Sequence, residues 1–154
     1  MKASRATTMP VMILERTPPI CFHPLVNFSR WVFRIAGIYG LIVLVPQYFM
    51  EAQVGRTYPP LITHPEFFYG FIGIAIAWQV VFLLIAQDPI RYRLVIIPGI
   101  LEKFSFGIAA LILNAQGRIS PSPVGPLGGA IVDLVLGTLF LVAFYKTAGP
   151  RLLK

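Results

Sequence analysis

The sequence has little cysteine, little acid and little charge of any kind. Of its 154 residues only one, Cys21, is a cysteine, which excludes an intrachain disulfide and a metal site built from several thiolates of this chain. Charged residues make up 12% of the chain, about half of what a soluble domain carries. Since 56% of the residues are apolar, the composition indicates a protein whose solvent is largely the lipid bilayer.

Motifs of soluble-enzyme chemistry are also missing. The sequence contains no HExxH, no CxxC and no arrangement typical of a serine triad, and its glycines lack the spacing of a phosphate-binding loop. The histidines, His23 and His64, are candidate ligands for haem or a chlorophyll magnesium, but both lie beside prolines at span ends and no second ligand matches them in spacing. We therefore predict no catalytic residue, no metal and no cofactor.

Four stretches are long and apolar enough to cross a membrane as helices. The clearest covers residues 67–86, which carry no charge and, at about 1.5 Å per residue, match the hydrocarbon core in length. The other predicted spans are residues 31–50, 94–114 and 127–145. We predict an all-α fold, a polytopic membrane protein with a four-transmembrane-helix bundle in one domain over residues 1–154. Residues 1–30 are expected to be cytoplasmic or interfacial, although Pro24 could start helix 1 early.

The positive charges predict the orientation of the spans. Most of the 13 lysines and arginines flank one side of the predicted membrane: Lys2, Arg5, Arg16, Arg30, Arg34, Arg91, Arg93, Lys146, Arg151 and Lys154. The loops on the other side hold only Arg56 and Arg118. Because cytoplasmic flanks carry the excess of Lys and Arg, we expect both the N and C termini in the cytoplasm. The same distribution explains the net charge of +7 without nucleic-acid binding.

Two helix starts have sequence signatures of their own. Thr63 followed by Glu66 predicts a capping box at the start of helix 2, in which each side chain bonds to a backbone amide of the other residue. Asp88 followed by Pro89 predicts the same function at the start of helix 3.

The most informative polar residue is Glu102, inside predicted helix 3. Projected at 100° per residue, Pro98, Glu102, Ser105 and Ala109 fall within about 40° of one line and form a face of small and polar groups. Such a face favours close helix contact, so we expect Glu102 to point into the protein. Pro98 is expected to bend the helix one turn before Glu102.

Lys103 needs a partner as well. It lies about 100° round the helix from Glu102, so we expect the two side chains not to share one groove. Lys103 should either reach Asp133, the only other acid well inside a span, or be covered by a second protein chain. Asp133 stands between Gly129 and Gly137 at spacings of four, which predicts a tight helix–helix contact around its carboxylate.

Gln79 in predicted helix 2 lies at a depth similar to that of Glu102, which would allow a hydrogen bond between them. Two interpretations of Gln79, Glu102, Lys103 and Asp133 are open. They pair the helices structurally, or they form an intramembrane site for a proton, an ion or a ligand.

Four short motifs carry a resemblance to known proteins. They are His64-Pro65-Glu66-Phe67-Phe68-Tyr69-Gly70, Trp78-Gln79, Asp88-Pro89-Ile90-Arg91 and Leu101-Glu102-Lys103-Phe104. In these motifs the chain resembles small bacterial four-helix membrane proteins, and its layout is similar to that of DoxX-like proteins. The resemblance implies a multi-pass protein of the bacterial inner membrane and implies no activity.

Three functions are compatible with these features. The first is a non-catalytic accessory or scaffolding subunit of a larger inner-membrane complex, such as one for electron transfer, with a protein partner against helix 2 or helix 3. Small residues on more than one side of helix 2 and the direction of Lys103 favour it. The second is a small membrane enzyme or carrier for an apolar ligand, a quinone, sterol-like or acyl molecule, with Glu102 as acid or base. The third is a proton or ion pathway.

Overall fold

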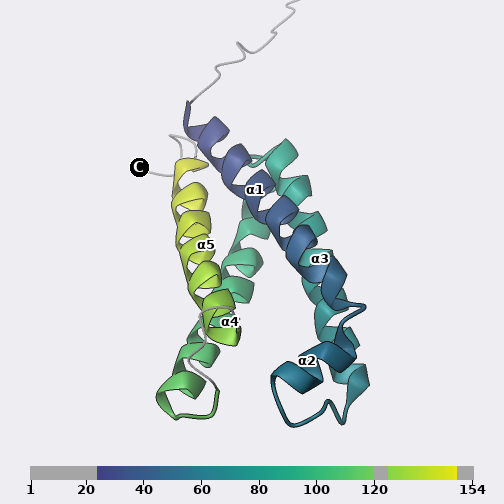
Figure 1. Cartoon of the computed structure of the whole chain (residues 1–154). Coiled ribbons are helices and arrows are strands. Elements are labelled where there is room, and N and C mark those ends of the chain that lie inside the picture. The colour runs from purple at the N-terminus through teal and green to yellow at the C-terminus, as the bar shows by residue number, and fades with distance from the viewer. Residues whose placement is uncertain (1–23, 120–124, 149–154) are drawn as a thin grey trace, which may run out of the picture.

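The computed structural model describes residues 24–119 and 125–148, and within these ranges the chain is helical and contains no strand (Figure 1). The elements are α1 (Pro24–Gln47), α2 (Glu51–Thr57), α3 (Pro65–Gln87), the short 3₁₀-helix η1 (Arg93–Val95), α4 (Ile96–Ala115) and α5 (Pro126–Lys146). Cys21 and His23 lie outside the described residues. The all-α prediction is confirmed.

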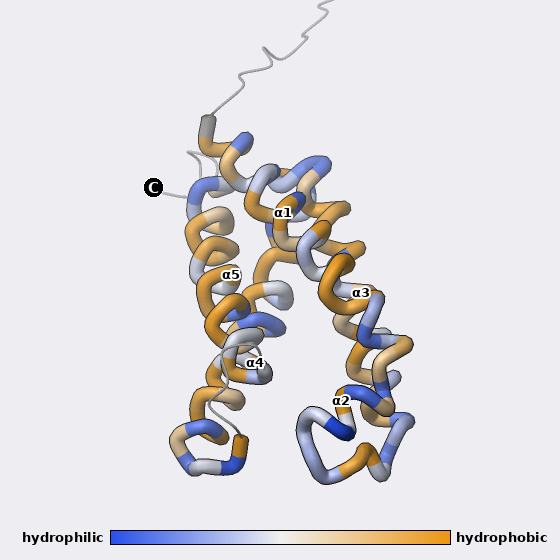
Figure 2. Tube along the Cα trace, viewed as in Figure 1, coloured by the Kyte–Doolittle hydropathy of each residue, from blue (hydrophilic) through white to orange (hydrophobic). Residues whose placement is uncertain are grey.

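Four helical segments are long and apolar enough to cross a membrane, as predicted. They are Leu25–Gln47, Pro65–Gln87, Arg93–Ala115 and Pro126–Lys146. Figure 2 shows hydrophobic residues along these helices and hydrophilic residues gathered towards their ends. At about 1.5 Å per residue, a helix of 23 residues is about as long as the hydrocarbon core is thick.

The first span begins earlier than the predicted residues 31–50. Helix α1 starts at Pro24 and ends at Gln47, so residues 24–30 belong to the helix and not to a separate segment. Pro24 is the early start that the sequence offered as an alternative, because proline is well suited to the first turn of a helix.

The connection between α1 and α3 contains a helix that the sequence did not predict. Helix α2 is held against α3 by a hydrogen bond of 2.8 Å, which the Tyr69 hydroxyl donates to Glu51 Oε2. The α1–α3 connection is therefore an ordered cap on this part of the protein (Figure 1).

The predicted capping box of α3 is wrong. The N-cap is His64 and not Thr63, and no side chain there bonds to a backbone amide of the helix. Glu66 Oε1 instead lies 3.3 Å from His64 Nδ1. Pro65 explains the difference, because its restricted φ suits the first helical position and so makes its predecessor the cap.

The predicted start and bend of helix 3 are also different. Asp88 Oδ1 accepts a hydrogen bond of 3.1 Å from the Arg91 amide, so Asp88 stabilises a turn that precedes η1 and does not cap α4. Pro98 is the third residue of α4, where backbone amides have no acceptor within the helix. The proline therefore does not kink a continuous helix, and the irregularity is the 3₁₀ turn before it.

The long helices form two hairpins, α1 with α3 and α4 with α5. Each hairpin packs closely at glycines. A Cβ atom at Gly37 of α1 would lie 2.9 Å from the Gln79 carbonyl oxygen of α3, and one at Gly107 of α4 would lie 2.7 Å from Leu134 Cγ of α5. A larger residue at either position would push the backbones apart, so these glycines set the helix separation.

The two hairpins meet at one end of the molecule around three phenylalanines. The Phe140 ring centroid lies 4.4 Å from that of Phe33 and 4.8 Å from that of Phe82, and all three side chains are fully buried. This is the closed end, near the start of α1 and the end of α5 (Figure 1). The hairpins diverge towards the open end, where α2, the end of α4 and the start of α5 lie (Figure 1).

Candidate ligand-binding cavity

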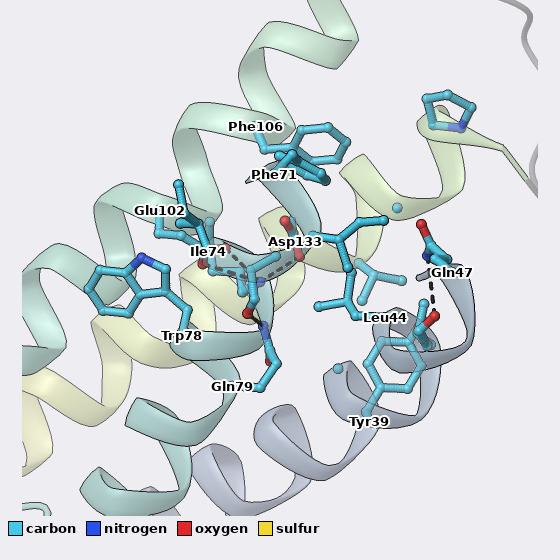
Figure 3. Close-up of a pocket in the computed structure, with 18 of the residues that line it drawn as sticks. Tyr39, Leu44, Gln47, Phe71, Ile74, Trp78, Gln79, Glu102, Phe106 and Asp133 are labelled. Atoms are coloured by element: carbon cyan, nitrogen blue, oxygen red, sulfur yellow. Dashed lines mark hydrogen bonds and ion pairs between the residues drawn. The ribbon is translucent and has the colours of Figure 1, made fainter. Parts of the chain in front are cut away.

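A cavity of about 960 Å³ lies between the diverging hairpins. All four long helices contribute to it, together with residues of α2 and its flanks. Its walls are mainly aromatic and aliphatic, and include Tyr39, Val43, Phe71, Trp78, Phe106 and Val132. Figure 3 shows Phe71 and Phe106 side by side from α3 and α4, and their ring centroids are 6.1 Å apart.

Among the residues that the structure describes, the charged ones that line this cavity are Glu102, Lys103 and Asp133, here called the charged cluster. Lys103 Nζ lies 3.0 Å from Asp133 Oδ1 on α5 and 3.2 Å from Glu102 Oε2 on its own helix. The lysine side chain is 7% exposed, and those of Glu102 and Asp133 are 22% and 19% exposed. One ammonium thus bridges two carboxylates from neighbouring helices.

This arrangement confirms one sequence prediction and corrects another. Lys103 reaches Asp133, the first of the two alternatives that the sequence left open. The prediction that Glu102 and Lys103 cannot share a groove is wrong, because both lie on the cavity and form an ion pair. The four methylenes of a lysine allow its ammonium to lie far from the direction of its Cα–Cβ bond.

The buried face of α4 is turned by one residue from the predicted one. Pro98, Ser105 and Ala109 are exposed, and only Glu102 of that predicted face is partly buried. The residues of α4 that are buried are Ile96, Gly99, Lys103, Gly107 and Ala110. The helix therefore packs through Gly99 and Gly107, with Lys103 midway between them. The charge of the lysine makes this pattern unlike the usual contact face of small residues.

Asp133 lies on α5 beside a close helix–helix contact, as predicted. A Cβ atom at Gly137 would lie 3.3 Å from Lys103 Cβ, so α4 and α5 approach closely beside the ion pair. Gly129, in contrast, is exposed, and the nearest atom to its Cβ position is 3.7 Å away in Phe106. The predicted ridge thus packs tightly at Gly137 and loosely at Gly129.

The composition of the charged cluster has an energetic consequence. Two carboxylates face one ammonium, so the cluster has an excess negative charge when all three groups are ionised. Removing charges from water costs several kcal/mol for each ion in real proteins, and pairing offsets this cost only when each charge is matched. The Phe82 ring, 5.5 Å from Lys103 Nζ, adds a third favourable contact for the cation but none for the acids.

Gln79 lines the same cavity but does not bond to Glu102, so that prediction is wrong. Its side chain is buried, and Nε2 donates a hydrogen bond of 3.0 Å to the Ala75 carbonyl oxygen of its own helix. It fills the space beside Gly40 of α1, where a Cβ atom would overlap the amide group. Figure 3 shows Gln79 among the lining residues, with its hydrogen bond drawn as a dashed line.

The histidine candidate that the structure describes, His64, lies elsewhere. His64 is exposed at the start of α3 and pairs with Glu66, outside the cavity lining. Among the residues that the structure describes, no group of three His, Cys, Asp or Glu side chains could hold a metal ion.

Sequence reasoning found the charged cluster and missed the cavity. The aromatic residues Tyr39, Trp78 and Phe106 were not singled out, since aromatic residues in apolar spans are typical of lipid-facing or core positions. Residue type alone does not mark the lining, because it includes glycines such as Gly40 and Gly129 as well as bulky residues such as Phe71 and Ile74.

The chemistry of the cavity is that of an anchor for a polar group inside an apolar space. Carboxylates can accept hydrogen bonds, pair with a cation or exchange a proton.

Comparisons of the chain with protein-family models, with curated proteins and with solved structures find no match. The similarity to DoxX-like proteins stays a prediction.

Proposed function

We propose that this chain is a multi-pass protein of the bacterial cytoplasmic membrane that binds an amphipathic, lipid-soluble molecule between its two hairpins. The observation that carries the proposal is the apolar cavity of about 960 Å³ with a single charged cluster on its lining. Ligand sites are typically cavities of about 300 to 1,000 Å³ with mostly apolar walls and a few convergent polar groups. This cavity has that size and that composition.

The proposed orientation has both termini in the cytoplasm. It is supported by the cationic side chains near the closed end, among them Arg30, Arg34, Arg93 and Lys146, since cytoplasmic flanks carry the excess of Lys and Arg. In this orientation the open end and its cavity face the outer half of the membrane. A ligand would enter from the outer leaflet, where the hairpins diverge, and its polar group would reach the charged cluster near mid-membrane.

A binding function is shared by a carrier and by a small enzyme. In a carrier the charged cluster holds the ligand reversibly, and in an enzyme Glu102 acts on it as acid or base. The accessory-subunit hypothesis stays a sequence prediction. Purification in a mild detergent, followed by mass spectrometry, tests it, because an accessory subunit should co-migrate with a stoichiometric partner.

Filling the cavity tests the proposed function directly. Val132→Trp places a large ring on the lining. Ile131→Trp places the same ring at the neighbouring position, where the isoleucine is 52% exposed and not part of the lining. We expect small molecules bound to the purified wild type and to Ile131→Trp, and absent from Val132→Trp, when organic extracts are compared by mass spectrometry. The same retained molecules in both variants would contradict ligand binding in this cavity.

A further inference from the structure

We infer that the polar group of the ligand is an amine or ammonium, which donates hydrogen bonds to Glu102 and Asp133. This inference rests on the proposed function, and it defines the chemical class of the ligand at the same site. It follows from the balance of charge, of donors and acceptors, and of aromatic faces around the cavity.

The balance of charge favours a cation. Within the described part of the chain, the charged groups on the lining are two carboxylates and one ammonium, and the ammonium lies within 3.3 Å of both acids. A ligand ammonium would make the cluster neutral, which removes the cost of an unmatched buried charge. An anionic headgroup would add a second excess charge and be repelled.

The balance of donors and acceptors points the same way. Several polar hydrogens near Glu102 are already engaged: Lys103 Nζ directs two of its three N–H groups to the acids, Gln79 Nε2 donates one of its two to the Ala75 carbonyl, and Ser105 Oγ donates to the Glu102 carbonyl. Carboxylate oxygens, in contrast, each accept more than one hydrogen bond, and Glu102 Oε2 is buried without a hydrogen-bond donor in suitable geometry. The cluster therefore offers acceptors to a ligand and few donors.

The walls add faces that attract cations. Tyr39, Phe71 and Trp78 of the α1–α3 hairpin line the cavity, as Phe106 does on the opposite hairpin. Aromatic faces attract ammonium groups by about 0.5 to 2 kcal/mol each, and Trp is the most effective. The aliphatic part of the ligand would lie against the apolar remainder of the lining, which includes Val43.

Trp78 also provides the reporter for a test. The chain has two tryptophans, and the other, Trp31, is exposed and not part of the lining, so Trp31→Phe leaves the cavity tryptophan as the only one. The protein in phosphatidylcholine nanodiscs is titrated with octylamine, octanol or octanoate, and empty nanodiscs provide the baseline for partition into lipid. We expect a saturable change in Trp78 fluorescence with octylamine, a weaker response to octanol and none to octanoate.

Charge variants test whether the carboxylates cause the preference for octylamine. Glu102→Gln should weaken octylamine binding about tenfold and leave octanol binding nearly unchanged, because a charge-assisted hydrogen bond becomes a neutral one. Asp133→Asn should act in the same direction. The matched control is Glu66→Gln, the same substitution at an exposed acid outside the lining, which should change neither titration. Circular dichroism establishes that each variant is helical before titration.

The outcomes separate this inference from the proposed function. If octanoate or octanol binds as tightly as octylamine, or if Glu102→Gln leaves octylamine binding unchanged, the ammonium assignment is wrong. The proposed function would still stand if Val132→Trp abolishes ligand retention while Ile131→Trp does not. If those two tryptophan variants behave alike and none of the octyl compounds binds, both proposals fail.

Discussion

At the scale of single residues, Lys103 is the unusual feature of this protein. The residue as a whole, backbone included, is 5% exposed. It lies in a helix of membrane-spanning length, and its ammonium pairs with two acids. An ion in this environment is maintained by its partners, because water is not available to solvate it. The stability of the α4–α5 hairpin should therefore depend on keeping the charges of the cluster matched.

Removing the cation tests this dependence. Lys103→Met leaves two carboxylates facing each other, and we expect it to lower the free energy of unfolding by about 3 to 5 kcal/mol. The triple variant Lys103→Met, Glu102→Gln, Asp133→Asn has no charge to match and should recover most of this loss. Unfolding in mixed micelles with increasing denaturing detergent, followed by circular dichroism, gives the comparison.

The control for this series is Arg118→Met, which removes an exposed cation near the open end. It should change the free energy of unfolding by less than about 0.5 kcal/mol. A Lys103→Met variant as stable as Arg118→Met would show that the charged cluster does not stabilise the hairpin.

At the scale of helices and their contacts, close approach is localised at glycines. Gly37 faces the backbone of α3, while Gly70 of α3 has open space where a Cβ atom would be. The distinction cannot be read from the residue type, which is the same at both positions. It depends on which side of each helix meets a neighbour.

A pair of alanine substitutions tests this localisation. Gly37→Ala should lower the free energy of unfolding by about 1 to 3 kcal/mol, because the new methyl group meets the Gln79 carbonyl oxygen. Gly70→Ala should be neutral or should stabilise by about 0.4 to 1 kcal/mol, because it reduces the freedom of the unfolded chain. Equal effects of the two substitutions in a thermal unfolding assay would contradict the described α1–α3 contact.

Helix α4 allows a second test at this scale. Pro98 is exposed in the first turn, so Pro98→Ala should change the free energy of unfolding by less than about 0.5 kcal/mol and leave ligand retention unchanged. Ile108→Pro, at an exposed position in the middle of the same helix, should cost about 3 kcal/mol, because it removes an internal hydrogen bond. A large effect of Pro98→Ala would instead support the sequence prediction of a functional bend at Pro98.

At the scale of the whole molecule, the divergence of the two hairpins creates the cavity. The aromatic contact of Phe33, Phe82 and Phe140 joins them at the closed end. Towards the open end residues of both hairpins line the cavity, and Phe71 of α3 lies beside Phe106 of α4. Under the proposed function, the placement of this opening relative to the membrane would determine which leaflet supplies the ligand.

Cysteine accessibility tests that placement. In a Cys21→Ser background, Gln116→Cys near the open end should react with a membrane-impermeant maleimide added to intact cells. Arg91→Cys, in the α3–α4 connection at the other end, should react only after the cells are opened. Both positions are exposed, so a difference in labelling reports the side of the membrane. The reversed pattern would overturn the proposed orientation.

The number and approximate limits of the long helices could be predicted from sequence, because a bilayer requires apolar segments of a set length whatever their neighbours are. The identity of the charged cluster was also predictable, since ionisable residues are rare in such segments. Helix starts were less predictable: His64 and not Thr63 precedes α3, because the constraint imposed by Pro65 outweighs a capping motif.

Only the tertiary structure decided which side of α4 is buried. Composition favoured the face with Glu102 and Ser105, but contact with α5 selects the face with Gly107 and Lys103, because Asp133 supplies the matching charge. The cavity was decided in the same way. A single sequence determines that its helices prefer lipid to water, since that preference belongs to each segment alone. The angle between the two hairpins depends on side chains from all four long helices at once. The space that the hairpins enclose depends on the same side chains.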